Sequence, residues 1–170
     1  MIAESGHLAV IIAFMVAIVQ SVVPMIGASK GYIGWMDAAR PSAIIQFLLI
    51  FFAFIMLTIS FVTSDFSVKL VASNSHSLKP LLYKISGVWG NHEGSMLLWI
   101  LILAFYGALV AVFGKRLPII LKARVLSVQA MIGVAFIAFL LFTSNPFERL
   151  IFPPFDGKDL NPLLQDPGLA

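Results

Sequence analysis

The stretch Gly94 to Gly114 reads GSMLLWILILAFYGALVAVFG and contains no charged residue. A helix of about 20 apolar residues is long enough to cross the hydrocarbon core of a bilayer, which is roughly 30 Å thick. Three more stretches of this kind occur in the chain, and the four predict spans at residues 8–28, 42–63, 94–114 and 125–144. Because lipid leaves each backbone group to be satisfied within its own segment, the spans are expected to be helices. The predicted fold class is an all-α, polytopic integral membrane protein with four transmembrane helices.

The composition of the chain supports this class and excludes others. Hydrophobic residues make up 60% of the chain and charged residues 11%, and the mean hydropathy is +1.00. A soluble domain of this length could not bury so much apolar surface. The net charge of +3 is not gathered in a basic cluster interleaved with aromatic residues, so no nucleic-acid partner is expected. The absence of cysteine excludes disulfides, thiolate metal ligands and thiol catalysis within this chain.

Charge placement predicts the orientation. The connection between the last two spans contains Lys115, Arg116, Lys122 and Arg124 and no acidic residue. By the positive-inside rule this short loop faces the cytoplasm, or the matrix of a mitochondrion. The N-terminus and the C-terminus are then both outside. We therefore expect a transmembrane bundle over residues 1–144, an outward loop over 65–93, and an outward, Pro-rich, extended tail over 145–170.

Small and amide side chains within the spans predict how the helices pack. Small residues four apart let a neighbouring helix approach closely, and buried amides seek partners across helices. The small residues are Ala104, Gly107, Ala108 and Ala111, and the amides are Gln20, Gln46 and Gln129. No Asp, Glu, Lys, Arg or His lies within a span, which argues against an ion-coupled transporter.

The segment WGNHEGSMLLW, Trp89 to Trp99, gathers polar residues where a loop becomes a predicted span. Asn91 suits a helix N-cap, and Glu93 suits the first turn, where the helix dipole favours an acid. Trp89 and Trp99 are typical of the aromatic belt at a membrane boundary. A cap and a belt leave His92 unexplained.

The glycines of this segment and the histidines of the chain have sequence contexts that bear on binding. Gly90 and Gly94 flank the His-Glu pair, and glycine admits close approach of a ligand or partner to the backbone. A zinc-peptidase motif would need a second His four residues after His92, and that position is Met96. We therefore predict no catalytic and no metal-ligating residue in this chain. His7 and His76 are expected to be isolated and solvated.

The tail NPFERLIFPPFDGKDLNPLLQDPGLA, residues 145–170, holds five of the nine prolines and many apolar residues. Proline prevents a long helix or a central strand. The composition is too apolar for a disordered linker, so we expect ordered, extended chain on the outer surface, with another part covering it.

Three motifs carry a resemblance that covers nearly the whole chain. They are YKISGVWGNHEGSMLLW from Tyr83, NPFERL from Asn145, and DGKDLNPLLQDPGL from Asp156. The chain resembles the N-terminal part of the cytochrome c maturation protein F family, of the CcmF and CycK type. The resemblance implies a role in c-type cytochrome biogenesis, within a haem lyase complex that holds and presents haem for covalent attachment to apocytochrome c. It implies the cell inner membrane or the mitochondrial inner membrane as the location.

The resemblance also implies partners and a site. The partners are a haem chaperone, thioredoxin-like and apocytochrome-binding subunits, apocytochrome c and membrane lipid. The haem-binding Trp-rich segment and the axial haem ligands of the family are not in this chain, whose tail is expected to continue in the full-length family. The fragment alone is expected to be inactive. The residues expected to form a wall of the haem site or a partner surface are Trp89, Gly90, Asn91, His92, Glu93, Gly94, Ser95, Asp159, Asn161, Pro162, Gln165, Asp166 and Pro167. Two alternatives remain: a structural or assembly subunit without haem contact, and a fragment of a haem transporter.

Overall fold

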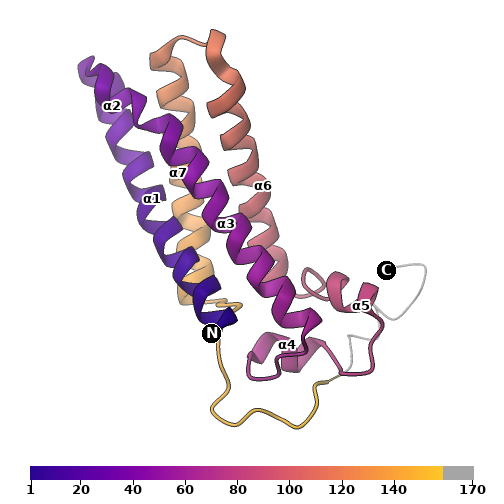
Figure 1. Ribbon diagram of the computed structural model, residues 1–170. Coiled ribbons are helices and arrows are strands. Elements are labelled where there is room, and N and C mark those ends of the chain that lie inside the picture. Colours follow the sequence, from indigo (N-terminus) through magenta and orange to yellow (C-terminus); the bar gives the residue numbers. More distant parts are fainter. Residues whose placement is uncertain (159–170) are drawn as a thin grey trace.

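The computed structural model describes residues 1–158 and is helical in all its long elements (Figure 1). The elements are α1 (Ile2–Lys30), α2 (Ile33–Asp37), α3 (Ala39–Val62), α4 (Lys69–Asn74), α5 (Leu81–Ser86), α6 (His92–Phe113), the 3-10 helix η1 (Gly114–Arg116) and α7 (Ile119–Phe142). Four segments are long and apolar enough to cross a membrane: Ile2–Lys30, Ile33–Val62, His92–Arg116 and Ile119–Phe142. The predicted fold class of an all-helical membrane protein is confirmed.

The four long helices pack as one bundle in which α3 and α7 each contact both α1 and α6. Small residues such as Ala13, Ala17 and Ala53 are fully buried where helices approach each other, and Leu57 and Phe61 fill the space between them. Large apolar side chains also cover the outside of every long helix. A helix that is apolar on all sides is typical of a membrane span.

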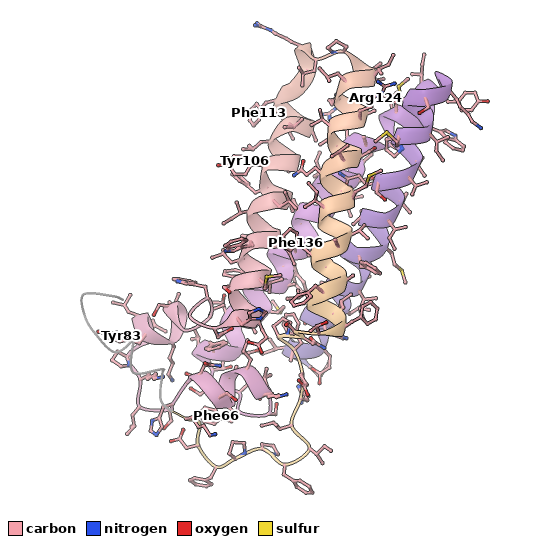
Figure 2. All side chains as sticks on the ribbon, turned by 180° about the vertical axis from the view of Figure 1, so that it is seen from behind. Phe66, Tyr83, Tyr106, Phe113, Arg124 and Phe136 are labelled. Atoms are coloured by element: carbon pink, nitrogen blue, oxygen red, sulfur yellow. The ribbon has the colours of Figure 1, made fainter. Side chains whose placement is uncertain are left out.

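The connections and the short helices lie at the two ends of the bundle. The N-terminus, α4, α5 and the segment 143–158 lie at one end, and α2 and η1 lie at the other (Figure 1). Figure 2 shows Arg124 far from Phe66 and Tyr83, which belong to the layer built around α4 and α5. We call the first of these the N-terminal end of the bundle. The charge pattern predicts that this end faces outward.

Each long helix begins before the hydrophobic span expected from the sequence, and α1 also ends after its expected span. α1 begins at Ile2, and Glu4 in its first turn suits the positive end of the helix dipole. Arg149 also pairs with this carboxylate, with Nη2 lying 2.8 Å from Glu4 Oε1. α1 ends at Gly31, which has φ 76° and donates its N–H to Gly27, a left-handed cap that glycine adopts without strain.

The amide clamps between helices are confirmed for two of the three glutamines. Gln20 Nε2 on α1 donates to the Leu126 carbonyl on α7 across 3.2 Å. Gln129 Nε2 on α7 donates to the Leu103 carbonyl on α6. A Cβ on Gly107 would lie 2.8 Å from Gln129 Nε2, so α6 and α7 come together where glycine makes room.

A short ladder joins the segment after α7 to the start of α4. Val68 and Arg149 form an isolated antiparallel bridge. Lys69 N donates to the Glu148 carbonyl, and Leu150 N donates to the Ser67 carbonyl, each across 2.9 Å. This ladder holds the segment 145–150 against the N-terminal end of the bundle.

Candidate functional site

The turn between α5 and α6 is organised by Asn91. Its Oδ1 accepts from Gly94 N across 2.7 Å, which makes Asn91 the N-cap of α6, as predicted. Its Nδ2 donates to the carbonyls of Gly87 and Val88 across 2.8 and 3.3 Å. One amide side chain thus hydrogen-bonds to a backbone N–H in the first turn of α6 and to two backbone carbonyls in the turn that precedes it.

Gly94 has a structural role that differs from the one expected. A Cβ at this position would collide with the Val88 carbonyl oxygen of the same turn. Gly94 is buried, so its backbone is close to its own chain and closed to a ligand. The expectation that this glycine leaves space for a ligand or partner is wrong for residue 94, because the preceding turn folds back over it.

His92 is the residue of this turn that the cap does not use. Its side chain is exposed, although its carbonyl accepts from Ser95 Oγ across 2.9 Å. Its Nδ1 lies 3.4 Å from Ser144 Oγ, just beyond the end of α7. Its ring also meets Phe139 of α7 edge to face, with centroids 6.1 Å apart. The imidazole is therefore directed toward α7, with one nitrogen near the Ser144 hydroxyl.

An open apolar groove begins at His92 and follows the line between α6 and α7. It has a volume of about 560 Å³ and is lined by His92, Met96, Ile132, Ala135, Phe136 and Phe139. A second hollow of about 290 Å³ continues along the same face and shares Phe136 with it; it is also lined by Trp99, Ile102, Leu103 and Tyr106. Figure 2 shows Phe136 and Tyr106 on this face of the bundle. Leu103 also accepts the bond from Gln129, so the clamp borders the hollow.

The other residues of the predicted site are distributed unevenly. Trp89 is 44% exposed, and Gly90, Glu93 and Ser95 are half-buried around the same turn. Asp159, Asn161, Pro162, Gln165, Asp166 and Pro167 lie outside the described residues 1–158. Sequence reasoning missed Ser144, Phe139 and Met96. The position of Ser144 at the last residue of the predicted span 125–144 was the available signal.

A second polar cluster ties the segment after α7 to the loop between α4 and α5. Asp156 Oδ2 accepts from Ser77 Oγ across 2.7 Å, and its Oδ1 accepts from Ser77 N across 3.1 Å and from Gly157 N across 2.8 Å. His76 Nε2 lies 3.2 Å from Asp156 Oδ2. The hydrogen bond from the Ser77 hydroxyl is the main cause that lowers the pKa of Asp156 below its usual value.

The two remaining histidines are not isolated. His76 pairs with Asp156, and its Nδ1 accepts from Leu78 N across 3.3 Å. His7 is half-buried, and its ring meets Phe147 edge to face at 6.5 Å. The expectation that both side chains are isolated and solvated is wrong, because each packs against the segment that follows α7.

The arrangement favours binding over chemistry at the turn itself. Among residues 1–158, no group of three or more His, Asp or Glu side chains is placed to hold a metal ion. The distinctive feature is an exposed imidazole at the mouth of a long apolar groove. Such a mouth suits a flat or extended apolar molecule, or the apolar face of a protein partner.

Comparison with known proteins agrees with the motifs. The family of cytochrome C assembly proteins matches residues 89–170, which include the whole turn at the start of α6. The chain is 65% identical over 170 residues to the cytochrome c-type biogenesis protein ccl1 of Rhodobacter capsulatus. The aligned region covers 100% of this chain and 26% of that protein. It is 54% identical to the cytochrome c-type biogenesis protein CcmF of Pseudomonas aeruginosa, over 99% of this chain and 26% of that protein.

A solved structure gives the same result at the level of the fold. The cytochrome c haem lyase CcmF matches with a TM-score of 0.80 and 28% identity, over 87% of this chain and 25% of that chain. The chain thus spans about a quarter of the length of the relatives it matches. With its four helices able to span a bilayer, it is a multi-pass membrane protein.

Proposed function

We propose, from the premise that the chain is a member of the cytochrome c maturation protein F family of CcmF and CycK type, that it serves c-type cytochrome biogenesis as the N-terminal module of a haem lyase complex. In this role it helps to hold and present haem for covalent attachment to apocytochrome c. The Trp89–Ser95 turn forms a wall of the haem site or a partner surface. The module resides in the inner membrane and works with a haem chaperone and with thioredoxin-like and apocytochrome-binding subunits.

The observation that carries this proposal is the position of His92. A helix cap and a membrane belt would account for Asn91 and Trp89 alone. They would not require an exposed imidazole turned toward α7 at the end of a groove of about 560 Å³. The groove walls include Met96, Phe136 and Phe139, which are suited to the apolar edge or face of a macrocycle.

Haem fits this region as a molecule held against a wall. The His92 imidazole lines the groove, and its Nδ1 lies 3.4 Å from the Ser144 hydroxyl. Its second ring nitrogen, Nε2, is therefore the one that could meet a bound molecule. A haem iron held by a protein takes its axial ligand from a side chain such as His. The family resemblance implies that the axial ligands are not among the residues of this chain. The chemistry belongs to haem and thiols, and these residues would orient and shield it.

The test is alanine substitution in the full-length protein within a working maturation system. Trp89→Ala, His92→Ala and Glu93→Ala should each lower the yield of covalent cytochrome c several-fold while the protein accumulates normally. Trp35→Ala is the matched control, because Trp35 is 46% exposed at the opposite end of the bundle and Trp89 is 44% exposed. Normal yield in all three variants would favour the alternative function, a structural subunit without haem contact. The roles of Asn91 and Gly94 in the fold of the turn are consistent with that alternative.

The proposed function also predicts whether the isolated chain binds haem. Purified alone, it should show no stoichiometric Soret band, because the axial ligands of the family are not among its residues. A stable, stoichiometric band that His92→Ala removes would make His92 a ligand and would overturn this assignment.

The orientation is tested separately. A reporter that is active only in the cytoplasm or matrix should be active when fused at Lys115. A reporter that is active only outside should be active when fused at Lys79. The reverse result would place the turn and the groove mouth on the wrong side for apocytochrome c.

A further inference from the structure

The described chain holds a contact between two regions that lie 79 residues apart in sequence. Asp156 accepts three hydrogen bonds, from Ser77 Oγ, Ser77 N and Gly157 N, and His76 Nε2 lies 3.2 Å from it. We call this set of contacts the Asp156 clasp. The loop that contains Ser77 leads through α5 into the Trp89–Ser95 turn. The segment that contains Asp156 leads into the residues of the predicted site from Asp159 onward.

We propose that Asp156 is a positioning residue, which ties the segment 151–158 to the α4–α5 loop and so holds in place the loop that leads through α5 into the Trp89–Ser95 turn. This inference rests on the proposed function of the Trp89–Ser95 turn. It deepens that function by naming a residue outside the turn that fixes the loop leading into it.

The backbone around Asp156 is built for this contact. Lys158 N donates to the Ala72 carbonyl near the end of α4 across 2.7 Å. A Cβ on Gly157 would collide with the Ser75 carbonyl oxygen and would lie 2.8 Å from the Phe66 ring. The segment thus lies directly against the α4 end, at a distance that only glycine permits at position 157.

The clasp is the second of two attachments of the same segment. The first is the ladder at Val68 and Arg149, which ends with the bond from Leu150 N to the Ser67 carbonyl. Between the two attachments, Ile151, Phe152 and Phe155 are 89%, 87% and 106% exposed. Figure 1 shows this stretch as an arch on the far side of α4 from the bundle. Because the exposed side chains of the arch make little packing contact, the position of residues 156–158 depends on the Asp156 clasp.

The hydrogen-bond pattern of His76 identifies the role as positional. Its Nδ1 accepts from Leu78 N across 3.3 Å, so Nε2 is the nitrogen that carries the proton toward Asp156. Both imidazole nitrogens are therefore used in holding the loop. A carboxylate that already accepts three hydrogen bonds and pairs with this imidazole is arranged as an anchor.

The experiment compares Asp156→Ala with Glu148→Ala in the full-length protein within the maturation system. Glu148 is the matched control, because it lies in the same segment and its carboxylate makes an exposed ion pair with Lys69, of the kind that contributes little. We expect Asp156→Ala to lower cytochrome c yield at least fivefold at normal accumulation and Glu148→Ala to change it less than twofold. Trypsin applied from the outer side should cleave after Lys158 faster in Asp156→Ala.

A covalent replacement separates positioning from other roles of the carboxylate. The chain has no cysteine, so Ser77→Cys with Asp156→Cys introduces one defined pair where Ser77 Oγ and Asp156 Oδ2 are 2.7 Å apart. The cross-linked pair, verified by gel shift after alkylation, should restore most of the yield, and each single cysteine should not. Asp156→Asn keeps the oxygen that accepts from the two backbone N–H groups and should retain more yield than Asp156→Ala.

Three outcomes would overturn the proposal. They are normal yield in Asp156→Ala while His92→Ala is defective, a cross-linked pair that stays as defective as Asp156→Ala, and an Asp156→Asn variant as defective as Asp156→Ala. If His92→Ala, Trp89→Ala and Glu93→Ala are all normal, the proposed function fails instead. In that case, faster trypsin cleavage after Lys158 in Asp156→Ala would still show that Asp156 attaches this segment to the α4–α5 loop.

Discussion

Helix α6 contains two buried glycines, one in its first turn and one in its second half, and the neighbours of these glycines differ. At the N-terminal end, Gly94 lies against the backbone carbonyl of Val88, within a turn organised by Asn91. Toward the opposite end, Gly107 lies against the flexible side chain of Gln129 on α7. The first contact is rigid and local, whereas the second is adjustable and joins two helices. The difference shows that the turn before α6 is held by its own backbone, and that the α6–α7 contact depends on a side chain.

The same comparison explains where the groove lies. Near Gly107, small residues and the Gln129 clamp bring α6 and α7 together. Nearer the start of α6, the bulky side chains Met96 and Phe139 line the apolar groove, which has His92 at its mouth. Close approach at one end and bulky side chains at the other make the opening asymmetric.

The largest effect is expected at the rigid contact. In Gly94→Ala, the new Cβ meets the Val88 carbonyl, which can move only if the turn and its hydrogen bonds to Asn91 shift. Overpacking against backbone should cost about 3 kcal/mol. The measurement is the loss of folded protein on heating in detergent, compared with Gly34→Ala, where the added Cβ meets nothing within 4 Å. Equal stability of the two variants would show that the turn before α6 is loose.

The next effect concerns the amide that organises the turn. Asn91→Ala removes the cap bond to Gly94 N and two donations to the carbonyls of Gly87 and Val88. Loss of an N-cap costs about 1 kcal/mol, and the additional bonds raise the expected cost to about 2 kcal/mol. Asn91→Asp keeps the acceptor for Gly94 N and should recover part of it in the same assay. A cost within about 0.3 kcal/mol would mean that solvent replaces all three bonds.

A smaller effect is expected at the adjustable contact. In Gly107→Ala the methyl group displaces the Gln129 amide and weakens its bond to the Leu103 carbonyl, while alanine favours the helix over glycine. The two effects oppose each other, so the net cost should be about 1 kcal/mol. Gly107→Ala combined with Gln129→Ala should cost less than the sum of the two single changes, because they share one contact. Strict additivity would show that the two residues do not interact.

The principal helices could be predicted from the sequence because composition and charge spacing determine them. The short helices α2, α4 and α5 were not predicted, since five or six residues carry too little periodicity and such helices depend on tertiary contacts. The Asn91 cap was predicted because a cap is a local pattern. The role of Gly94 was not, because it depends on the fold of the preceding turn. The pairing of His76 with Asp156 joins positions far apart in sequence, and nothing local in either segment indicates it.

The smallest effect on stability is expected at His92, and it separates the fold of this turn from its function. The imidazole is exposed, its contact with Ser144 Oγ is long at 3.4 Å, and the cap of α6 does not use its side chain. His92→Ala should therefore change the free energy of unfolding by no more than about 0.5 kcal/mol, as is usual for surface substitutions. Ser144→Ala serves as its partner variant and should match it within that range. If His92→Ala instead destabilises the protein as much as Asn91→Ala, the imidazole is part of the fold. A defect in cytochrome c maturation would then report lost structure, which would favour the structural subunit. If stability is unchanged while maturation falls, the same turn contains one set of residues that builds it and one residue that it presents to the groove.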